Sequence, residues 1–302
     1  MSLKRGSCMG KTRYVFQITR SCYRTWKSAP KILVLLGMIA CFVVIYARPF
    51  AENASVQGEQ LQAGEMFVAL MNWRFTMLLF STASLLMFGN LPVIERFTGN
   101  ALIRGTRRSW IMGQIIYVVL TSLAIALLIF VMSLIVGLPN INFSNEWSRP
   151  VKLIALSKRA ALSGGTLQIF IPKYIVVTYS PWQAFAHSFC MFFLMNCFYG
   201  VAALMLRMKF KSAGFVILMA FNTVAWSSAI FMPGMNEFVI MSILSVHYHT
   251  SLSAHQAANM NALLPTLGES YAIMIGATLL MALLAVLVVR KYDYVQSEEE
   301  NT

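Results

Sequence analysis

Acidic residues are scarce in this chain, and none lies inside its long apolar stretches. The 302 residues include only 11 acidic ones, which are Asp293 and ten Glu, all in loops, tails or the ends of apolar stretches. Ion-coupled carriers usually keep a carboxylate near the middle of the membrane, where it is costly and retained for function. The scarcity argues against a pump that moves substrate with its own proton or sodium relay.

Sequence motifs for the common catalytic sites are also absent. The chain has no HExxH pair, no GxSxG turn and no Walker A loop. Its five cysteines are expected to be unpaired, since Cys190 and Cys197 lie about 10 Å apart along one predicted helix. We therefore expect no catalytic residues, no cofactor and no enzyme activity in this chain. His247, His249 and His255 are spaced as a possible metal cluster, but ordinary polar loop residues are the favoured interpretation, so no metal is predicted.

Apolar residues, by contrast, dominate the chain. They make up 58% of it, and charged residues only 12%, against roughly a quarter in soluble domains. A helix needs about 20 apolar residues to cross a bilayer. The sequence predicts an all-α, polytopic membrane protein with six transmembrane helices, at residues 32–47, 75–94, 110–137, 182–206, 213–232 and 271–289.

The distribution of basic residues predicts the orientation. With the N-terminus in the cytoplasm, 17 of the 24 Lys and Arg lie in inside segments. This is the positive-inside pattern, and it predicts a multi-pass protein of the cell membrane with both termini cytoplasmic. The outside loops are then 48–74, 138–181 and 233–270. The net charge of +13 is explained by topology and contact with anionic membrane lipids, so no nucleic-acid partner is expected.

The chain divides into three predicted parts. Residues 1–30 form a cytoplasmic tail, 31–292 the six-helix domain, and 293–302 an acidic cytoplasmic tail. Within the first part, Val15, Ile18, Cys22 and Trp26 share one helical face, while Arg13, Arg20, Arg24 and Lys27 share the opposite one. This pattern predicts an interfacial amphipathic helix lying flat in the headgroup region, with a disordered basic tail as the alternative.

Two further features bear on function. The loop 138–181 is predicted to hold a surface helix at 151–161 and a strand-like or interfacial segment at 168–179. Polar residues inside the predicted spans include Gln114, His187, Asn196, Tyr199 and Asn222. They either join helices through hydrogen bonds, the favoured role for any one of them, or line a transport path. Gln114, Asn196, Tyr199 and Asn222 are the candidate path residues.

The segment between the second and third predicted spans carries a family resemblance. Glu95-Arg96, Gly99-Asn100, Leu102-Ile103-Arg104, Arg107-Arg108-Ser109 and Ile111-Met112-Gly113 resemble the permease subunits of type-2 ABC exporters. The six spans and the amphipathic N-terminal helix are similar to that family, although its connection between spans three and four is usually short. In the family this segment is the coupling helix that docks on a separate ATPase.

The resemblance implies a function and a set of partners. The chain would be the membrane-spanning subunit of an ATP-driven exporter that moves an amphipathic substrate (a peptide, a lipid or a drug-like molecule) out of the cell. Its partners would be an ABC ATPase and a second permease subunit, as a homodimer or heterodimer. The implied ATPase-coupling residues are Glu95, Arg96, Gly99, Arg104, Arg107 and Arg108. The alternative is a non-transporting membrane sensor or assembly factor that recognises ligands through loop 138–181.

Overall fold

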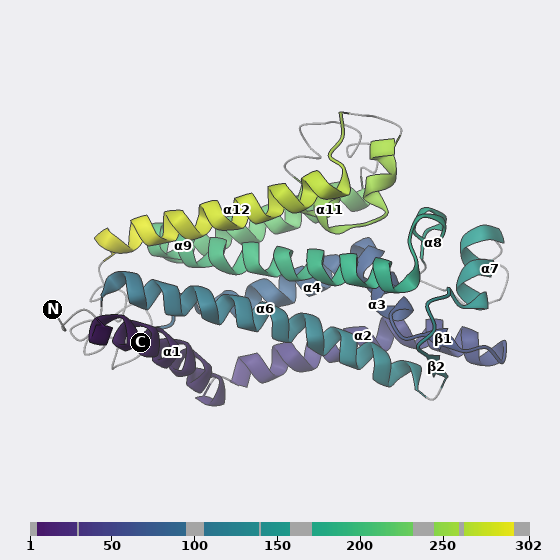
Figure 1. Cartoon of the computed structure of the whole chain (residues 1–302), viewed down its shortest axis with the longest axis horizontal. Helices are drawn as coiled ribbons and strands as arrows, with labels where there is room; N and C mark the ends of the chain where they lie inside the picture. The colour runs from purple at the N-terminus through teal and green to yellow at the C-terminus, as the bar shows by residue number, and fades with distance from the viewer. Residues whose placement is uncertain are drawn as a thin grey trace.

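The computed structural model describes residues 5–28, 30–94, 106–138, 140–157, 171–231, 245–259 and 263–292. These residues are almost entirely helical (Figure 1). Four of the described helices are long and apolar enough to cross a membrane, and a bent helix pair raises the number to five. The chain is therefore an all-α protein with the helices of a membrane protein, as the composition predicted.

The first membrane-length helix is longer than predicted. Helix α2 covers Pro30–Val56, so it continues through Pro49 past the predicted end at residue 47. Helices α3 (Glu65–Asn72) and α4 (Arg74–Phe88) follow and meet at an angle of 86°. The bend lies at Trp73, whose extended backbone ends α3 and precedes α4. The predicted second span, 75–94, corresponds to α4 and the residues after it.

Two other long helices begin at capping residues. Helix α6 (Arg107–Gly137) starts where the Thr106 side chain accepts the Ser109 N–H. Helix α12 (Leu267–Val288) starts with a capping box, in which Thr266 and Glu269 satisfy each other's backbone N–H groups. A short 3₁₀ helix, η5 (Val289–Lys291), follows α12. At 1.5 Å per residue α6 is about 46 Å long, more than a hydrocarbon core of roughly 30 Å.

Helix α9 (Pro181–Phe231) folds back on itself. Its backbone leaves the helical conformation at Lys211, where φ is 55°, and Figure 1 shows the two halves running in opposite directions. Close packing confirms the tight turn: a Cβ on Gly214 would lie 2.3 Å from the backbone oxygen of Leu206. Only glycine permits this approach. Residues 181–210 and 212–231 are thus two antiparallel helices.

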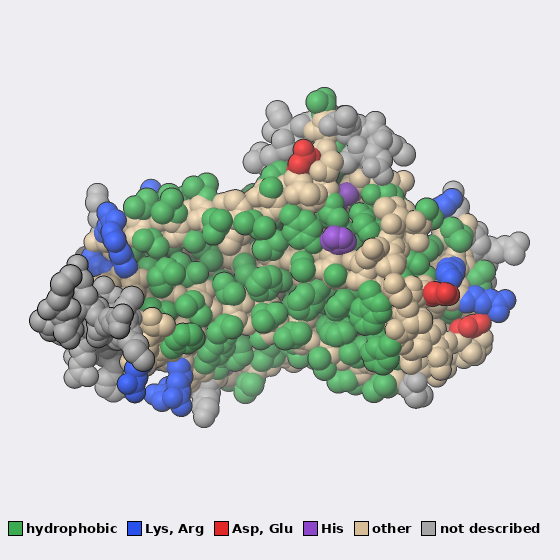
Figure 2. Space-filling model, viewed as in Figure 1, with side chains coloured by type: hydrophobic (Ala, Val, Ile, Leu, Met, Phe, Trp, Pro, Cys, Tyr) green, Lys and Arg blue, Asp and Glu red, His purple; other side chains and the backbone are tan. Residues whose placement is uncertain are grey.

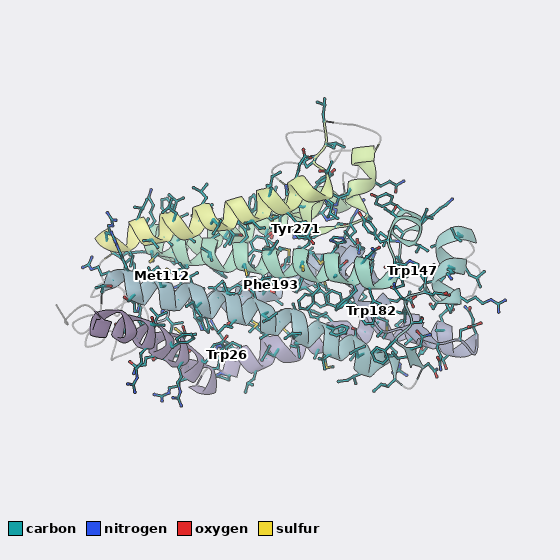
Figure 3. All side chains as sticks on the ribbon, viewed as in Figure 1. Trp26, Met112, Trp147, Trp182, Phe193 and Tyr271 are labelled. Carbon is teal, nitrogen blue, oxygen red and sulfur yellow. The ribbon has the colours of Figure 1, made fainter. Side chains whose placement is uncertain are left out.

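The N-terminal amphipathic pattern forms a helix, but its apolar face is covered by protein. Helix α1 (Arg5–Arg24), followed by η1 (Thr25–Ser28), packs along the first turns of α6. Thr19 Oγ1 donates to the Gly113 carbonyl at 3.0 Å, and Trp26 Nε1 donates to the Tyr117 hydroxyl at 2.8 Å (Figure 3). A Cβ on Gly113 would lie 2.7 Å from Ile18 Cγ2. The apolar face of α1 therefore contacts α6, and the interfacial position of this helix stays a prediction.

One end of the bundle is built from the segments around 60 and 140–180, and we call it the loop end. Strands β1 (Leu61–Gln62) and β2 (Ile141–Asn142) pair in parallel there. Helix α7 (Arg149–Ser157) confirms part of the predicted surface helix. Helix α8 (Lys173–Thr178) shows that the strand-like alternative for 168–179 is wrong in the described residues, and the interfacial alternative stays a prediction. Trp147 Nε1 donates to the Tyr179 carbonyl at 2.8 Å (Figure 3).

A buried carboxyl group holds the loop end together. Glu65 accepts the backbone N–H of Gln62 at 3.0 Å and that of Ser148 at 2.6 Å. Burial raises the pKa of Glu65 to about 7, and the two N–H groups oppose that rise. Loops 48–74 and 138–181, which are distant in sequence, are therefore joined through one side chain.

The surface shows two charged ends and an apolar band between them (Figure 2). The end opposite the loop end, which we call the basic end, includes the start of α6, the turn of α9 and the end of α12. Arg107 Nη1 donates there to the Arg290 carbonyl at 2.5 Å. The described Glu residues lie on segments toward the loop end. Helix α12 leaves many apolar side chains exposed, including Ile275, Leu279, Leu280, Leu283 and Leu287.

Candidate functional site

Of the four predicted path residues, Gln114 has a structural role. Its Nε2 donates to the Val93 carbonyl at 3.0 Å, and its Oε1 accepts the Val93 N–H at 3.2 Å. Both ends of the amide are thereby used to hold the chain after α4 against α6. Gln114 is fully buried, and this two-point contact explains a polar residue there without a transport path.

The other three predicted residues lie together in the interior of α9. Asn196 and Tyr199 are on the first half, and Asn222 is on the second. The second half adds Trp226, whose indole nitrogen lies beside the Tyr199 hydroxyl without a hydrogen bond of normal geometry. All four side chains are fully buried. We call Asn196, Tyr199, Asn222 and Trp226 the polar layer.

The fold of α9 places the polar layer well away from the turn of the helix, at a distance comparable to half the thickness of a hydrocarbon core. Its four residues are 11 to 15 positions from Lys211, which corresponds to about 16–22 Å at 1.5 Å per residue. Half of a roughly 30 Å hydrocarbon core is about 15 Å. Because the two halves run antiparallel, positions before and after the turn reach the same depth, and Tyr199 meets Trp226.

Each residue of the polar layer carries a buried polar atom with no hydrogen-bond partner in the described part of the chain. The atoms are Asn196 Oδ1, Tyr199 Oη, Asn222 Oδ1 and Trp226 Nε1. Both asparagines use only their Nδ2 groups. Asn196 Nδ2 donates to the Phe192 carbonyl at 2.8 Å, and Asn222 Nδ2 donates to Thr82 Oγ1 at 3.1 Å. A buried unpaired group costs about 1–3 kcal/mol. Four such atoms at one depth can bind the polar groups of a ligand.

A short hairpin packs on the polar layer from the side of the loop end. It comprises α11 (Val246–Thr250) and the 3₁₀ helix η4 (Ala254–Asn259), and we call residues 245–259 the histidine hairpin. The His247 ring lies against Trp226 with ring centroids 4.7 Å apart. Burial, then the nearby charge of Arg74, lowers the pKa of His247 to about 3. This ring is therefore neutral at pH 7.

The other two histidines of the hairpin meet at Ser270 of α12. His249 Nδ1 and His255 Nε2 each lie 2.9 Å from Ser270 Oγ. All three histidines are buried, so the expectation of ordinary polar loop residues is wrong. No group of three potential metal ligands is found among the described residues. The cluster is thus a hydrogen-bonded one.

Asn72, at the end of α3, also holds the histidine hairpin. Its Oδ1 accepts the Ser253 N–H at 3.2 Å. On the far side of the hairpin, the Tyr248 hydroxyl donates to the Pro265 carbonyl at 2.9 Å. Near these contacts α9 and α12 are joined by His187 Nδ1 and the Tyr271 hydroxyl, 3.1 Å apart (Figure 3). Elements from four parts of the chain therefore meet beside the polar layer.

Most of the predicted ATPase-coupling residues, Glu95, Arg96, Gly99 and Arg104, lie outside the described residues. Arg107 and Arg108 form the first turn of α6 at the basic end, and both are exposed. Positive charge at a helix N-terminus interacts unfavourably with the helix dipole and destabilises the helix by some tenths of a kcal/mol. Their position is not explained by the stability of α6.

The comparisons with known proteins identify no relative. No protein-family model matches the chain, and neither the curated proteins nor the solved structures include a match. The resemblance to type-2 ABC permeases stays a prediction that depends on the motif around 95–113 and on the predicted topology.

Sequence reasoning missed Trp226 and Ser270, and it did not predict the buried, hydrogen-bonded role of the three histidines. Trp226 was missed because tryptophan in an apolar span looks like any other large apolar residue. The histidine spacing was noticed, but only a ligand role and an exposed role were weighed. Ser270, at the end of a predicted span, carries no signal of its own.

Proposed function

We propose that this chain is the membrane-spanning permease subunit of an ATP-driven exporter. The observation that carries the proposal is the polar layer, a set of unpaired polar atoms at mid-membrane depth in a bundle without described acidic residues at that depth. Such a layer binds a polar group of an amphipathic substrate but supplies no carboxylate for ion coupling. The energy for transport then comes from a separate ATPase.

The topology of the proposal has six spans and cytoplasmic termini. The spans are α2, α4 with the residues that follow it, α6, the two halves of α9, and α12. The concentration of Lys and Arg at the basic end supports a cytoplasmic location for that end. The exposed apolar face of α12 is suited to lipid or to a second permease subunit.

The exposed Arg107 and Arg108 support ATPase docking at the basic end. They lie at the start of α6, which packs against α9 and α2. A partner that moves this helix end therefore also moves the helices around the polar layer. This positive charge opposes the dipole of α6. It is therefore explained by membrane topology, by ATPase docking or by both.

The test is a charge reversal with a matched control. Arg104, Arg107 and Arg108 are changed together to Glu, and the control changes Arg48, Arg149 and Lys173, at the loop end, to Glu. Exposed ion pairs contribute only about 0–1 kcal/mol each, so three changes are combined. The tagged wild type should co-purify a Walker A-bearing ATPase from its own cells, the control should retain it, and the triple variant should lose it or its stimulated hydrolysis. Wild type without an ATPase, or a triple variant that stimulates normally, contradicts the proposal.

The second candidate is a membrane sensor or assembly factor that uses loop 138–181. It is favoured by the packing of that loop on loop 48–74 through β1, β2 and Glu65. A fixed surface of this kind is suited to recognition. If this second function is correct, no ATPase co-purifies with the wild type. Changes at the loop end then alter the set of co-purified proteins, and changes at Arg107 and Arg108 do not.

A further inference from the structure

The hydrogen bonds around Ser270 determine where the protons lie. His255 Nδ1 is 2.9 Å from the Ser251 carbonyl oxygen, which can only accept, so Nδ1 carries a proton. In the neutral ring His255 Nε2 is then an acceptor, and the Ser270 hydroxyl donates to it. The serine oxygen accepts in turn, which requires a proton on His249 Nδ1. One arrangement of protons satisfies all three contacts.

This arrangement is a directed chain from His249 through Ser270 and His255 to the Ser251 carbonyl. It connects the two parts of the histidine hairpin to α12, because Ser270 belongs to α12 and the histidines belong to α11 and η4. Ser270 is fully buried, and the two histidines are 2% exposed. The hairpin is therefore attached to α12 by a chain whose order of donors and acceptors depends on neutral rings.

We propose that the histidine hairpin is a proton-responsive latch, held on α12 by the neutral His249–Ser270–His255 chain and released when its histidines take up protons. A proton added at His255 Nε2 turns that atom from an acceptor into a donor, so the Ser270 hydroxyl loses its acceptor while His249 keeps its proton on Nδ1. The cation formed is on a ring that is only 2% exposed. Release of the hairpin removes both problems, because the ring then becomes hydrated.

The groups that face the histidines oppose protonation in the closed state. Arg74, from α4, adds positive charge near His247, and a proton taken up by His249 opposes one on His255. Burial is the first cause in both cases, and the pKa of His255 is lowered to about 4 even though the Ser251 carbonyl favours its charged form. Among the described residues no carboxylate contributes to these shifts. Glu269 of α12 is exposed and accepts the Thr266 N–H at 2.7 Å. The remaining titratable groups around the hairpin are Tyr174, His187, Tyr248 and Tyr271.

The direction of the pH response follows from these shifts. A histidine whose pKa is lower in the closed state stabilises closure above the ordinary pKa of about 6.5, and that stabilisation is lost as pH falls below it. Between pH 7.5 and 5.5, each of His247 and His255 should raise the equilibrium constant for opening about tenfold. Together they give about a hundredfold. Opening uncovers Trp226, and with it the polar layer, toward the loop end.

The first experiment determines the protonation of the side chains directly. The chain has only four histidines, so nitrogen NMR of full-length protein labelled with ¹⁵N-histidine, in lipid nanodiscs, can separate them. His249 and His255 should both be neutral with the proton on Nδ1 at pH 7.5, and His255 should remain neutral at pH 5.5 in the closed population. An imidazolium at pH 7.5, or a proton on Nε2 of either ring, overturns the proposal.

The second experiment measures opening. Hydrogen–deuterium exchange of residues 246–256, corrected for the intrinsic rate, should show opening about a hundredfold more frequent at pH 5.5 than at pH 7.5. The double variant His247→Gln/His255→Gln should lose this response, and His187→Gln, on α9, should keep it. Equal protection of the wild-type hairpin at both pH values, or an unchanged response in the double variant, overturns the proposal. Neither experiment requires an ATPase, so the latch and the permease function can fail separately.

Discussion

Helices α9 and α12 are similarly apolar, yet they occupy opposite environments. In the most apolar part of each helix, 67% of the α9 residues are buried inside the bundle, but only 11% of the α12 residues. Both satisfy the hydropathy expected of a span, so hydropathy does not separate them. What separates them is the distribution of polar residues. In α9 fully buried polar residues lie well inside the helix, whereas in α12 Ser270 and Tyr271 lie near the start and Thr278, at the middle, donates to the Met274 carbonyl of its own helix.

The comparison shows how burial in this bundle is decided. Lipid tails are as apolar as leucine, so a leucine gains little by moving from lipid into protein. A polar side chain gains more, because lipid tails offer it no hydrogen-bond partner and the bundle offers some, as Thr82 does for Asn222. The polar residues of α9 therefore identify it as the central element, and the polar layer follows from the same cause.

The largest difference is expected at a pair of glycines. A Cβ on Gly200 of α9 would lie 2.4 Å from Val118 Cγ1, whereas a Cβ on Gly276 of α12 meets nothing within 4 Å. Gly200→Leu should prevent accumulation of folded protein, because a whole side chain cannot be accommodated between α9 and α6. Gly276→Leu should leave the yield of monodisperse protein unchanged. Equal yields for the two variants, measured by size-exclusion chromatography, would end the distinction between the helices.

Two leucine substitutions, one in each helix, measure the difference between α9 and α12 as a free energy of unfolding. Leu204 of α9 is fully buried, and Leu283 of α12 is 57% exposed. Leu204→Ala should lower the free energy of unfolding by about 2–5 kcal/mol, because it leaves a cavity. Leu283→Ala should change it by less than about 0.5 kcal/mol. Denaturant titration in micelles gives both values. A large loss at Leu283 would show instead that α12 is covered by a second chain.

A smaller effect of opposite sign is expected at Asn196. Its Oδ1 is buried and unpaired in the described structure, so Asn196→Leu, which keeps the branching of the side chain, should raise the free energy of unfolding by about 1 kcal/mol. Asn222→Leu should raise it less, because that change leaves the Thr82 hydroxyl without its partner. Thermal unfolding of the two variants checks the order. If Asn196→Leu is destabilising, Asn196 has a structural role and the case for the polar layer weakens.

The smallest effect concerns the contact between the two helices themselves. Tyr271→Phe removes the 3.1 Å contact between its hydroxyl and His187 Nδ1. The loss should be about 0.5–1.5 kcal/mol. A double-mutant cycle with His187→Leu isolates the pairwise energy. A coupling energy of zero would mean that α9 and α12 are joined by packing alone.

The sequence predicted the class of fold because a bilayer imposes a length and a polarity on each span. It also predicted α6 and α12 to within a few residues. It could not predict that α2 continues to Val56 or that α1 packs on α6, since both depend on tertiary contacts such as Ile18 with Gly113. The strand pair at Leu61 and Ile141 has no local signal, because two residues are too few for a period.

The candidate site was predicted in part for a related reason. Asn196, Tyr199 and Asn222 stood out as polar residues in apolar spans, which is a local signal. Gln114 gave the same signal, but its bonds to Val93 use both ends of the amide. The histidine chain could not be found from the sequence, because Ser270 meets His249 and His255 only after α11 folds onto α12.

The turn at Lys211 has a consequence for the order of events during synthesis. Polypeptide emerges at roughly 5–20 residues per second, so the second half of α9 follows the first within seconds, well before α12. With Gly214 against Leu206, the turn has no room for a separate loop. The two halves are therefore delivered as one unit, and Tyr199 can meet Trp226 while α12 is still being made. The polar layer is thus formed by segments that are synthesised one directly after the other. Helix α12, which contacts the histidines, is synthesised last and packs on α9 afterwards.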